Sequence, residues 1–143
     1  MALWLLTRDG AVSLPLPRVI RTSDDCTRAV EYATDLRLLP QVLSWTRTAS
    51  RPTSPAIVSA AEAAATRMYT DAVDHARGPV RLVVTRHPDR SVDLAIMDHG
   101  RHKDAPPPGG GMDQITGLAS WGWYGDDERG HRIWARIRPS GTP

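Results

Sequence analysis

The strongest constraint on the fold is a long central helix whose apolar residues surround much of its circumference. The pattern begins at Ser54 and Pro55, a capping residue followed by proline, and ends at Gly78 and Pro79. Two stripes run along this helix: the first holds Ile57, Ala61, Ala64, Met68, Asp71 and His75, and the second holds Ala65, Tyr69, Ala72, Val73 and Ala76. A helix with so wide an apolar surface is expected to pack deep against a sheet.

Strands on the C-terminal side of this helix supply the sheet. Residues 79–86 and 91–98 are predicted to form two strands, and residues 87–90 between them have the composition of a turn. This antiparallel hairpin leads into a glycine-rich segment. A last strand is predicted at residues 130–137, with its apolar positions facing inward.

Asp98 breaks the apolar face of the strand at 91–98. Val92, Leu94 and Ile96 share one face because side chains alternate along a strand. Asp98 has the same parity and is followed by Gly100, where the chain can turn away. An inward-facing carboxylate is costly unless other groups donate hydrogen bonds to it, so the pattern indicates a ligand site. The alternative is a strand that ends one residue early, with Asp98 capping the turn.

The glycine-rich segment after this strand contains a second candidate site. Gly109, Gly110 and Gly111 precede a helix that we predict at residues 113–121. Backbone N–H groups at a helix N-terminus can hold a phosphate. A flexible spacer would have the same composition, so both interpretations stay open.

The N-terminal residues are predicted to form a β-hairpin. Residues 3–7 and 11–16 flank an Asp-Gly pair at residues 9–10, which is a strong hairpin signal. Pro15 and Pro17 cannot donate hydrogen bonds, so the second arm is expected at a sheet edge. An isolated hairpin is marginally stable in water, so we expect this one to pair with the main sheet or with a second subunit.

The segment between the hairpin and the long helix is less clearly patterned. Residues 18–28 are interpreted as a loop or a short helix. Residues 30–34 resemble a strand, although they could also continue a helix. Pro40 suits the first turn of a helix that runs to about Ala49, and a linker follows at residues 50–55.

Length and charge restrict the class of protein. A chain of 143 residues fits one domain with a true core, and its hydrophobic fraction of 41% is ordinary for a globular protein. The formal net charge is only +2 although the isoelectric point is about 9.1. Lys103 is the only lysine, and no run of basic residues predicts a nucleic-acid surface.

Cysteine content and hydropathy indicate in which cellular compartment the protein is expected. Cys26 is the only cysteine, so neither an internal disulfide nor a cysteine-based zinc site is expected. The apolar N-terminal residues are too few for a signal sequence, and no segment approaches the length of a membrane span. We therefore expect a soluble, cytoplasmic protein.

The order of these elements resembles a known family. A helix ending in YTDAVDHA (residues 69–76) is followed by GPVRL (78–82), then MDHG (97–100), a glycine-rich loop and GHRIWA (130–135). This order is similar to that of the histidine-kinase-like ATPase superfamily of gyrase, heat-shock chaperones and sensor kinases. The small anti-sigma-factor serine kinases and their actinobacterial relatives are the most similar branch. The resemblance covers residues 55–137 and excludes the N-terminal hairpin.

The resemblance implies a site for ATP and Mg²⁺. The nucleotide-binding positions that it implies are Asp71, His75, Asp98, Gly100, Gly109, Gly110 and Gly111. Asp98 matches the adenine-binding aspartate, and the three consecutive glycines match the lid that lies against the phosphates. Asp71 takes the place of the asparagine that ligates magnesium, and its carboxylate oxygens are also suitable ligands for Mg²⁺.

One departure from the family pattern concerns catalysis. Arg67 stands where the family has the glutamate that activates the attacking group. A guanidinium group cannot give up its proton in a protein, so Arg67 cannot act as a general base. Loss of a base costs about 10²–10⁴-fold in rate, so no catalytic residue is assigned. Arg67 could instead pair with Asp71, four residues later on the helix, and even displace the metal.

Three functions follow from these observations. The first is a regulatory ATP-binding protein of anti-sigma type that acts by binding a protein partner, either a sigma factor or another regulator. The second is an active protein-serine kinase of the same fold, which the missing glutamate disfavours. The third is a DNA-associated transcriptional regulator, which the lack of a basic run disfavours. A homodimer is a further expectation.

The predicted fold is an α+β two-layer sandwich in a single domain over residues 1–143. The resemblance specifies a Bergerat-type nucleotide fold in residues 55–137, with a mixed, mainly antiparallel sheet and helices on one face. The N-terminal β-hairpin, residues 1–17, is an addition to this core.

Overall fold

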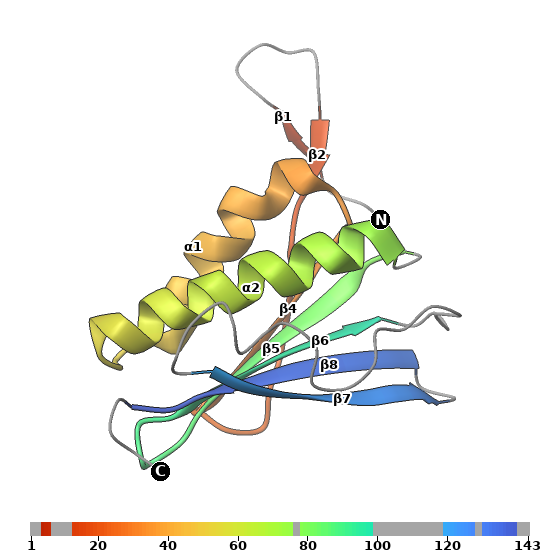
Figure 1. Ribbon diagram of the computed structural model, residues 1–143. Coiled ribbons are helices and arrows are strands. Elements are labelled where there is room, and N and C mark those ends of the chain that lie inside the picture. Colours follow the sequence, from red (N-terminus) through yellow and green to blue (C-terminus); the bar gives the residue numbers. More distant parts are fainter. Residues whose placement is uncertain (1–3, 7–12, 76–77, 99–118, 128–129, 140–143) are drawn as a thin grey trace.

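A computed structural model describes residues 4–6, 13–75, 78–98, 119–127 and 130–139 of the chain. These residues form two layers: a six-stranded sheet, and two helices that cover one face of it (Figure 1). The predicted α+β two-layer class is therefore confirmed. Every pairing in the sheet is antiparallel, so its described strands do not form the mixed sheet that was expected.

The elements follow one another in a simple order. They are β1 (Trp4–Leu6), β2 (Ser13–Pro15), β3 (Arg18–Ile20), β4 (Thr27–Tyr32), the 3-10 helix η1 (Leu36–Leu38), α1 (Leu39–Ser50), α2 (Pro55–His75), β5 (Val80–Arg86), β6 (Val92–Asp98), β7 (Ala119–Asp127) and β8 (Gly130–Ile137). The spatial order in the large sheet is β3-β4-β5-β6-β8-β7. β1 and β2 form a separate two-stranded sheet.

Both helices form where the sequence predicts them. α2 begins directly after Ser54, whose Oγ accepts a hydrogen bond of 3.3 Å from the backbone N–H of Ile57. α1 has Pro40 in its first turn, where a missing N–H costs nothing. Neither helix in the described part of the chain has the length and apolarity that crossing a membrane requires.

The core lies between these helices and the inner face of the sheet. α2 contributes Ile57, Ala60, Ala61, Ala64, Ala65, Met68, Tyr69 and Ala72, all of them buried. β5 and β6 contribute alternate residues to the same cluster, which are Val80, Leu82, Val84, Val92, Leu94 and Ile96. From β8, Ala135 and Ile137 face inward as predicted. The deep packing expected for α2 is thus confirmed.

Two predictions about secondary structure are wrong. Residues 18–28 were expected to be a loop or a short helix, but Arg18–Ile20 is strand β3, and β4 begins at Thr27. Residues 119–121 were expected to end a helix, but they begin strand β7. In both places the backbone hydrogen bonds go to a neighbouring strand, and a local pattern does not report such a partner.

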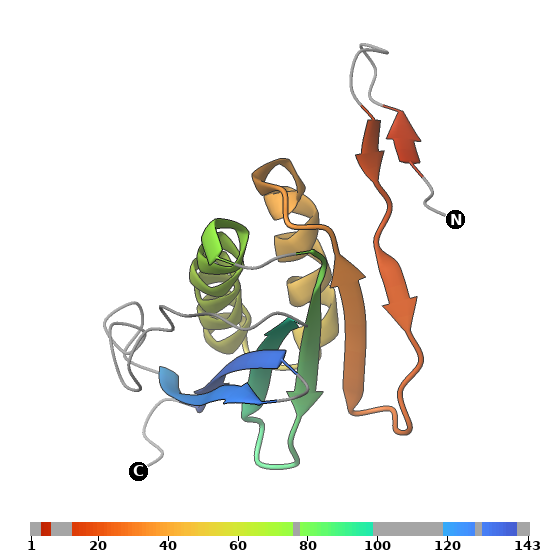
Figure 2. The ribbon, with the colours of Figure 1, turned by 90° about the vertical axis from the view of Figure 1, so that its right-hand side faces the viewer.

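The N-terminal hairpin pairs as predicted, but not with the main sheet. β1 and β2 are antiparallel, with Leu5 opposite Leu14, and they project beyond the two-layer body (Figures 1 and 2). Among the described residues the hairpin's contact with the core is made by Leu14, which packs against the core cluster. Pairing with a second subunit, the other expectation, stays a prediction.

A buried tyrosine fixes the helix layer to one end of the sheet. The Tyr69 hydroxyl donates to the carbonyl oxygens of Ala33 (2.6 Å) and Asp35 (2.9 Å), and it accepts from the Asp35 N–H (3.1 Å). These residues connect β4 to η1, so the hydroxyl joins α2 to the end of β4. Nearby, burial and the neighbouring Tyr69 raise the pKa of Tyr32 to about 12.

Removal of the Tyr69 hydroxyl should destabilise the protein measurably. Tyr69→Phe removes a hydrogen bond from three backbone groups, of which the Asp35 carbonyl keeps a second partner, the Leu38 N–H at 2.9 Å. We therefore expect a loss of about 1–3 kcal/mol in the free energy of unfolding. Tyr32→Phe is the matched control, since the Tyr32 hydroxyl makes one longer bond of 3.3 Å to the Gln41 carbonyl. Urea unfolding measures both variants, and equal losses would contradict the role given to Tyr69.

Candidate functional site

The candidate nucleotide site is at the end of the sheet where α2 also ends. α2 ends at His75, and β5 begins at Val80, only a few residues later. Arg81 pairs with Met97, so the same register places Asp98, the last residue of β6, beside Val80. The ends of α2 and β6 therefore lie at the same end of the molecule (Figure 1). The end of α2 and the end of β6, both singled out in the sequence, thus lie on the same side of the molecule.

Asp98 faces the core side of the sheet, as its parity predicts. It is only 4% exposed, on the same face as the buried residues Ile96 and Leu94. Its backbone lies opposite His131 of β8. Asp98 takes part in an interaction within the protein. Asp98 therefore belongs to β6 itself, so the strand does not end one residue early.

Arg67 and Asp71 form the ion pair that their spacing predicts. Arg67 Nε lies 3.2 Å from Asp71 Oδ2, across one turn of α2. The two side chains are 55% and 38% exposed, so the expectation that Asp71 would lie on a buried stripe is wrong. The apolar stripe narrows near the end of the helix, where the next acidic residue, Asp74, is exposed. An exposed pair of this kind contributes only about 0.2–0.5 kcal/mol.

Five of the predicted site positions cannot be placed at this end. Gly100, Gly109, Gly110 and Gly111 lie outside the described residues, as does most of the helix predicted at 113–121. His75 is the last residue of α2, and its side chain is likewise outside the described part. The structure thus describes the carboxylates of the candidate site, Asp71 and Asp98, and leaves its glycine loop as a prediction.

The carboxylates at this end have different chemistry. Asp98 is buried and can accept hydrogen bonds from N–H donors of a ligand in a water-poor setting. Asp71 is accessible, and a single oxygen, Oδ2, takes part in the pair with Arg67. Within the described residues no three His, Cys, Asp or Glu side chains gather as a metal cluster. A magnesium ion at Asp71 would need further ligands, and Mg²⁺ usually takes several of them from phosphates and water.

The structure also contains a charged cluster that sequence reasoning missed. Asp93, at the opposite end of β6 from Asp98, accepts hydrogen bonds from Arg136 Nε (2.7 Å) and Nη2 (2.9 Å), and its Oδ2 lies 2.9 Å from His87 Nε2. Burial alone would raise the pKa of Asp93, but these hydrogen bonds outweigh it and lower the pKa. The cluster joins β6 to β8 and the turn before β6. The sequence did contain one sign of this cluster: Asp93 alternates with the inward-facing residues Val92 and Leu94, so its side chain had to face outward.

A small cavity is present at the other end of α2. Its volume is about 250 Å³, and it lies between the last turn of α1 and the first turns of α2. The Arg47–Glu62 ion pair, with N and O atoms 2.6 Å apart, forms part of its wall. Asp71 lies near the C-terminal end of α2, so this cavity is separate from the candidate site.

Comparison with known proteins does not assign a family to this arrangement. No protein-family model matches the chain, and no curated protein matches it either. A functional conclusion must therefore be argued from the geometry of α2, β5 and β6 together with the motifs in the sequence.

The weakness of the Arg67–Asp71 pair can be tested directly. A double-mutant cycle with Arg67→Ala and Asp71→Ala should give a coupling of about 0.2–0.5 kcal/mol in the free energy of unfolding. The reason is that both side chains are well solvated. Thermal and urea unfolding of the four proteins measure the coupling. A value well above this range would make the pair a structural contact that a metal could not easily open.

Proposed function

We propose that this chain is a nucleotide-binding regulatory protein of the histidine-kinase-like ATPase type, which acts by binding a protein partner and does not turn over ATP. The observation that carries the proposal is the buried carboxylate of Asp98 at the end of β6, beside the end of α2. The resemblance of residues 69–76 and 97–100 to the family's motifs gives this position its interpretation. A regulator of anti-sigma type is the specific form that we propose.

In this proposal Asp98 reads the base of the nucleotide. A purine amino group is an N–H donor, and an ionised carboxylate is an acceptor, so the two match. The burial of Asp98 strengthens such a hydrogen bond, because water competes poorly there. Asp71 would hold Mg²⁺ and, through it, the phosphates; the bound nucleotide would supply the negative charge that the metal neutralises.

Arg67 decides what the site does with a bound triphosphate. Its guanidinium already lies at the Asp71 carboxylate, and the pair is exposed and weak. Arg67 can therefore release Asp71 to a metal and turn to a phosphate, for which a guanidinium is well suited. It cannot remove a proton from water or from a serine hydroxyl. Binding without turnover is the expected result.

Substitution of Asp98 tests the nucleotide site. Asp98→Asn replaces a charged acceptor by a neutral amide, so the affinity for ATP and ADP should fall by about tenfold or more, which corresponds to about 1.5–3 kcal/mol. Asp74→Asn, in the last turns of α2, is the matched control and should leave the affinity unchanged. Titration calorimetry with and without Mg²⁺ measures both. Equal affinities of wild type and Asp98→Asn, or no nucleotide binding by the wild type, would refute the site.

Phosphate release tests the lack of turnover. The purified protein with Mg-ATP should release phosphate no faster than a blank, because no general base stands at position 67. Arg67→Glu should introduce some turnover, although the new carboxylate would repel Asp71 unless Mg²⁺ bridges the two. Rapid release by the wild type that disappears in Asp98→Asn would instead identify an active enzyme, as in the protein-kinase alternative.

A further inference from the structure

We propose that the free edge of strand β3 receives an extended acidic segment of a protein partner as an additional strand. β3 is an edge strand of the large sheet. Among the described residues it pairs with β4 on one side, and its other side has no strand beside it (Figure 2). Such an edge offers backbone hydrogen bonds to an incoming strand. The proposed function includes binding of a protein partner, and this inference states what kind of segment that partner presents. It does not depend on the nucleotide site.

Apolar exposure is concentrated at this edge. Among the described residues the large hydrophobic side chains that are most exposed are Val19 (78%), Leu36 (49%) and Leu16 (38%). Val19 is in β3, Leu16 precedes β3, and Leu36 follows β4 at the same end of this antiparallel pair. Edge strands are usually protected by charges, prolines or covering segments, and large apolar residues left open on one mark an interaction surface.

The exposed charges on β3 and on the residue that follows it are basic. In the part of the chain that the structure describes, Arg18, Arg21 and Arg28 are exposed and form no ion pair. The β3–β4 register, continued by one residue, sets Arg21 opposite Arg28. Like charges placed opposite each other on a sheet are destabilising.

Among the described residues, the nearby carboxylates form no ion pair with these arginines. Glu31 lies across from Arg18 in the ladder, but its ion pair is with Arg81 of β5, at 4.0 Å. Asp24, in the turn before β4, accepts hydrogen bonds from the Cys26 N–H (2.8 Å) and from the Thr27 hydroxyl (3.5 Å). These carboxylates and that of Asp25 keep their negative charge, but Asp24 and Asp25 lie in the turn between β3 and β4, so Arg18 and Arg21 are the charged residues that an added strand would meet along β3.

The same charges select the kind of partner. An antiparallel pairing of β3 with β3 of a second copy would bring the arginines of both chains together, so a second copy is disfavoured here. The prolines at positions 15 and 17 lack N–H groups, so an added strand would pair with β3 and not with the segment before it. A strand that alternates acidic and aliphatic residues meets both requirements, because it can pair with Arg18 and cover Val19.

Two synthetic peptides test this inference with the full-length protein and no nucleotide present. The first alternates glutamate and valine, the second alternates lysine and valine, and both carry fluorescein. At low ionic strength the acidic peptide should raise the anisotropy signal on binding, and the basic peptide should not. The double variant Arg18→Glu/Arg21→Glu should weaken acidic-peptide binding by at least about tenfold and should gain binding of the basic peptide.

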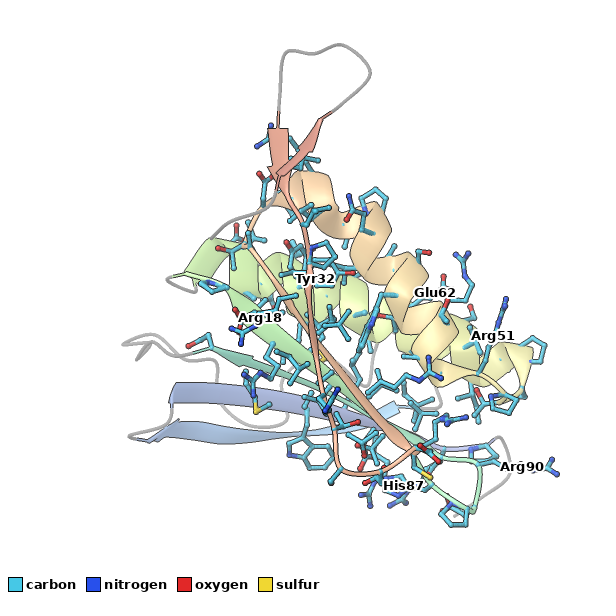
Figure 3. The ribbon with its side chains drawn as sticks, turned by 180° about the vertical axis from the view of Figure 1, so that it is seen from behind. Arg18, Tyr32, Arg51, Glu62, His87 and Arg90 are labelled. Carbon is cyan, nitrogen blue, oxygen red and sulfur yellow. The ribbon has the colours of Figure 1, made fainter. Side chains whose placement is uncertain are left out.

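The control is a second charge reversal of equal size away from the edge. Arg51 and Arg138 are exposed and, like the edge arginines, form no ion pair within the described residues; Arg51 lies at the far end of the helix layer from Arg18 (Figure 3). Arg51→Glu/Arg138→Glu should leave the affinity for the acidic peptide within about twofold of wild type. An equal loss in both double variants would overturn the inference, because it would indicate binding through net charge alone.

Hydrogen exchange gives a second readout that needs no variant. An added strand should slow amide exchange in residues 18–20 of the wild-type protein when the acidic peptide is bound. Absence of binding at low ionic strength, or protection that falls elsewhere in the described residues, would also overturn the inference. Because no nucleotide is used, failure here leaves the nucleotide site untouched, and failure of the Asp98 test leaves this edge untouched.

Discussion

The packing of α2 against the inner face of the sheet is the contact on which the rest of the structure depends. The face that meets the sheet is built mostly from alanines, with Ile57, Met68 and Tyr69 as its large members. Alanine combines high helix propensity with a small volume, so the helix can lie close to strands that carry larger aliphatic residues. The Tyr69 hydroxyl then fixes this helix to the segment after β4. The position of every residue near the end of α2 follows from that attachment.

Strand β6 carries two aspartates with different surroundings, Asp93 and Asp98. Asp93 faces outward and is held by Arg136 and His87, which stabilise its charged form. Asp98, five residues later, faces inward and is almost fully buried. Alternation along the strand is the cause of this difference. The outward carboxylate joins strands, and the inward one is the centre of the proposed nucleotide site.

The two proposed binding surfaces use different parts of the sheet. The nucleotide would lie where α2 and β6 end, whereas the acidic strand would add to β3 at one edge. Arg67 and Arg18 illustrate the contrast in charge. The first has a carboxylate partner within its own helix, and the second faces solvent without an ion pair in the described part of the chain. Nucleotide binding and partner binding can therefore be measured separately.

The sequence alone predicted the helices, the β5–β6 hairpin, the β1–β2 pairing and the inward side of Asp98, because caps, turns and periodicity are local signals. It also predicted the Arg67–Asp71 pair from a spacing of four, although not how exposed that pair would be. That Arg18–Ile20 and Ala119–Asp127 are strands became clear only in the folded protein, since their backbone hydrogen bonds are made to the neighbouring strands β4 and β8 and not within the segments themselves. The physical reason is the same throughout: a helix satisfies its backbone from its own residues, whereas an edge strand exists only through its neighbour.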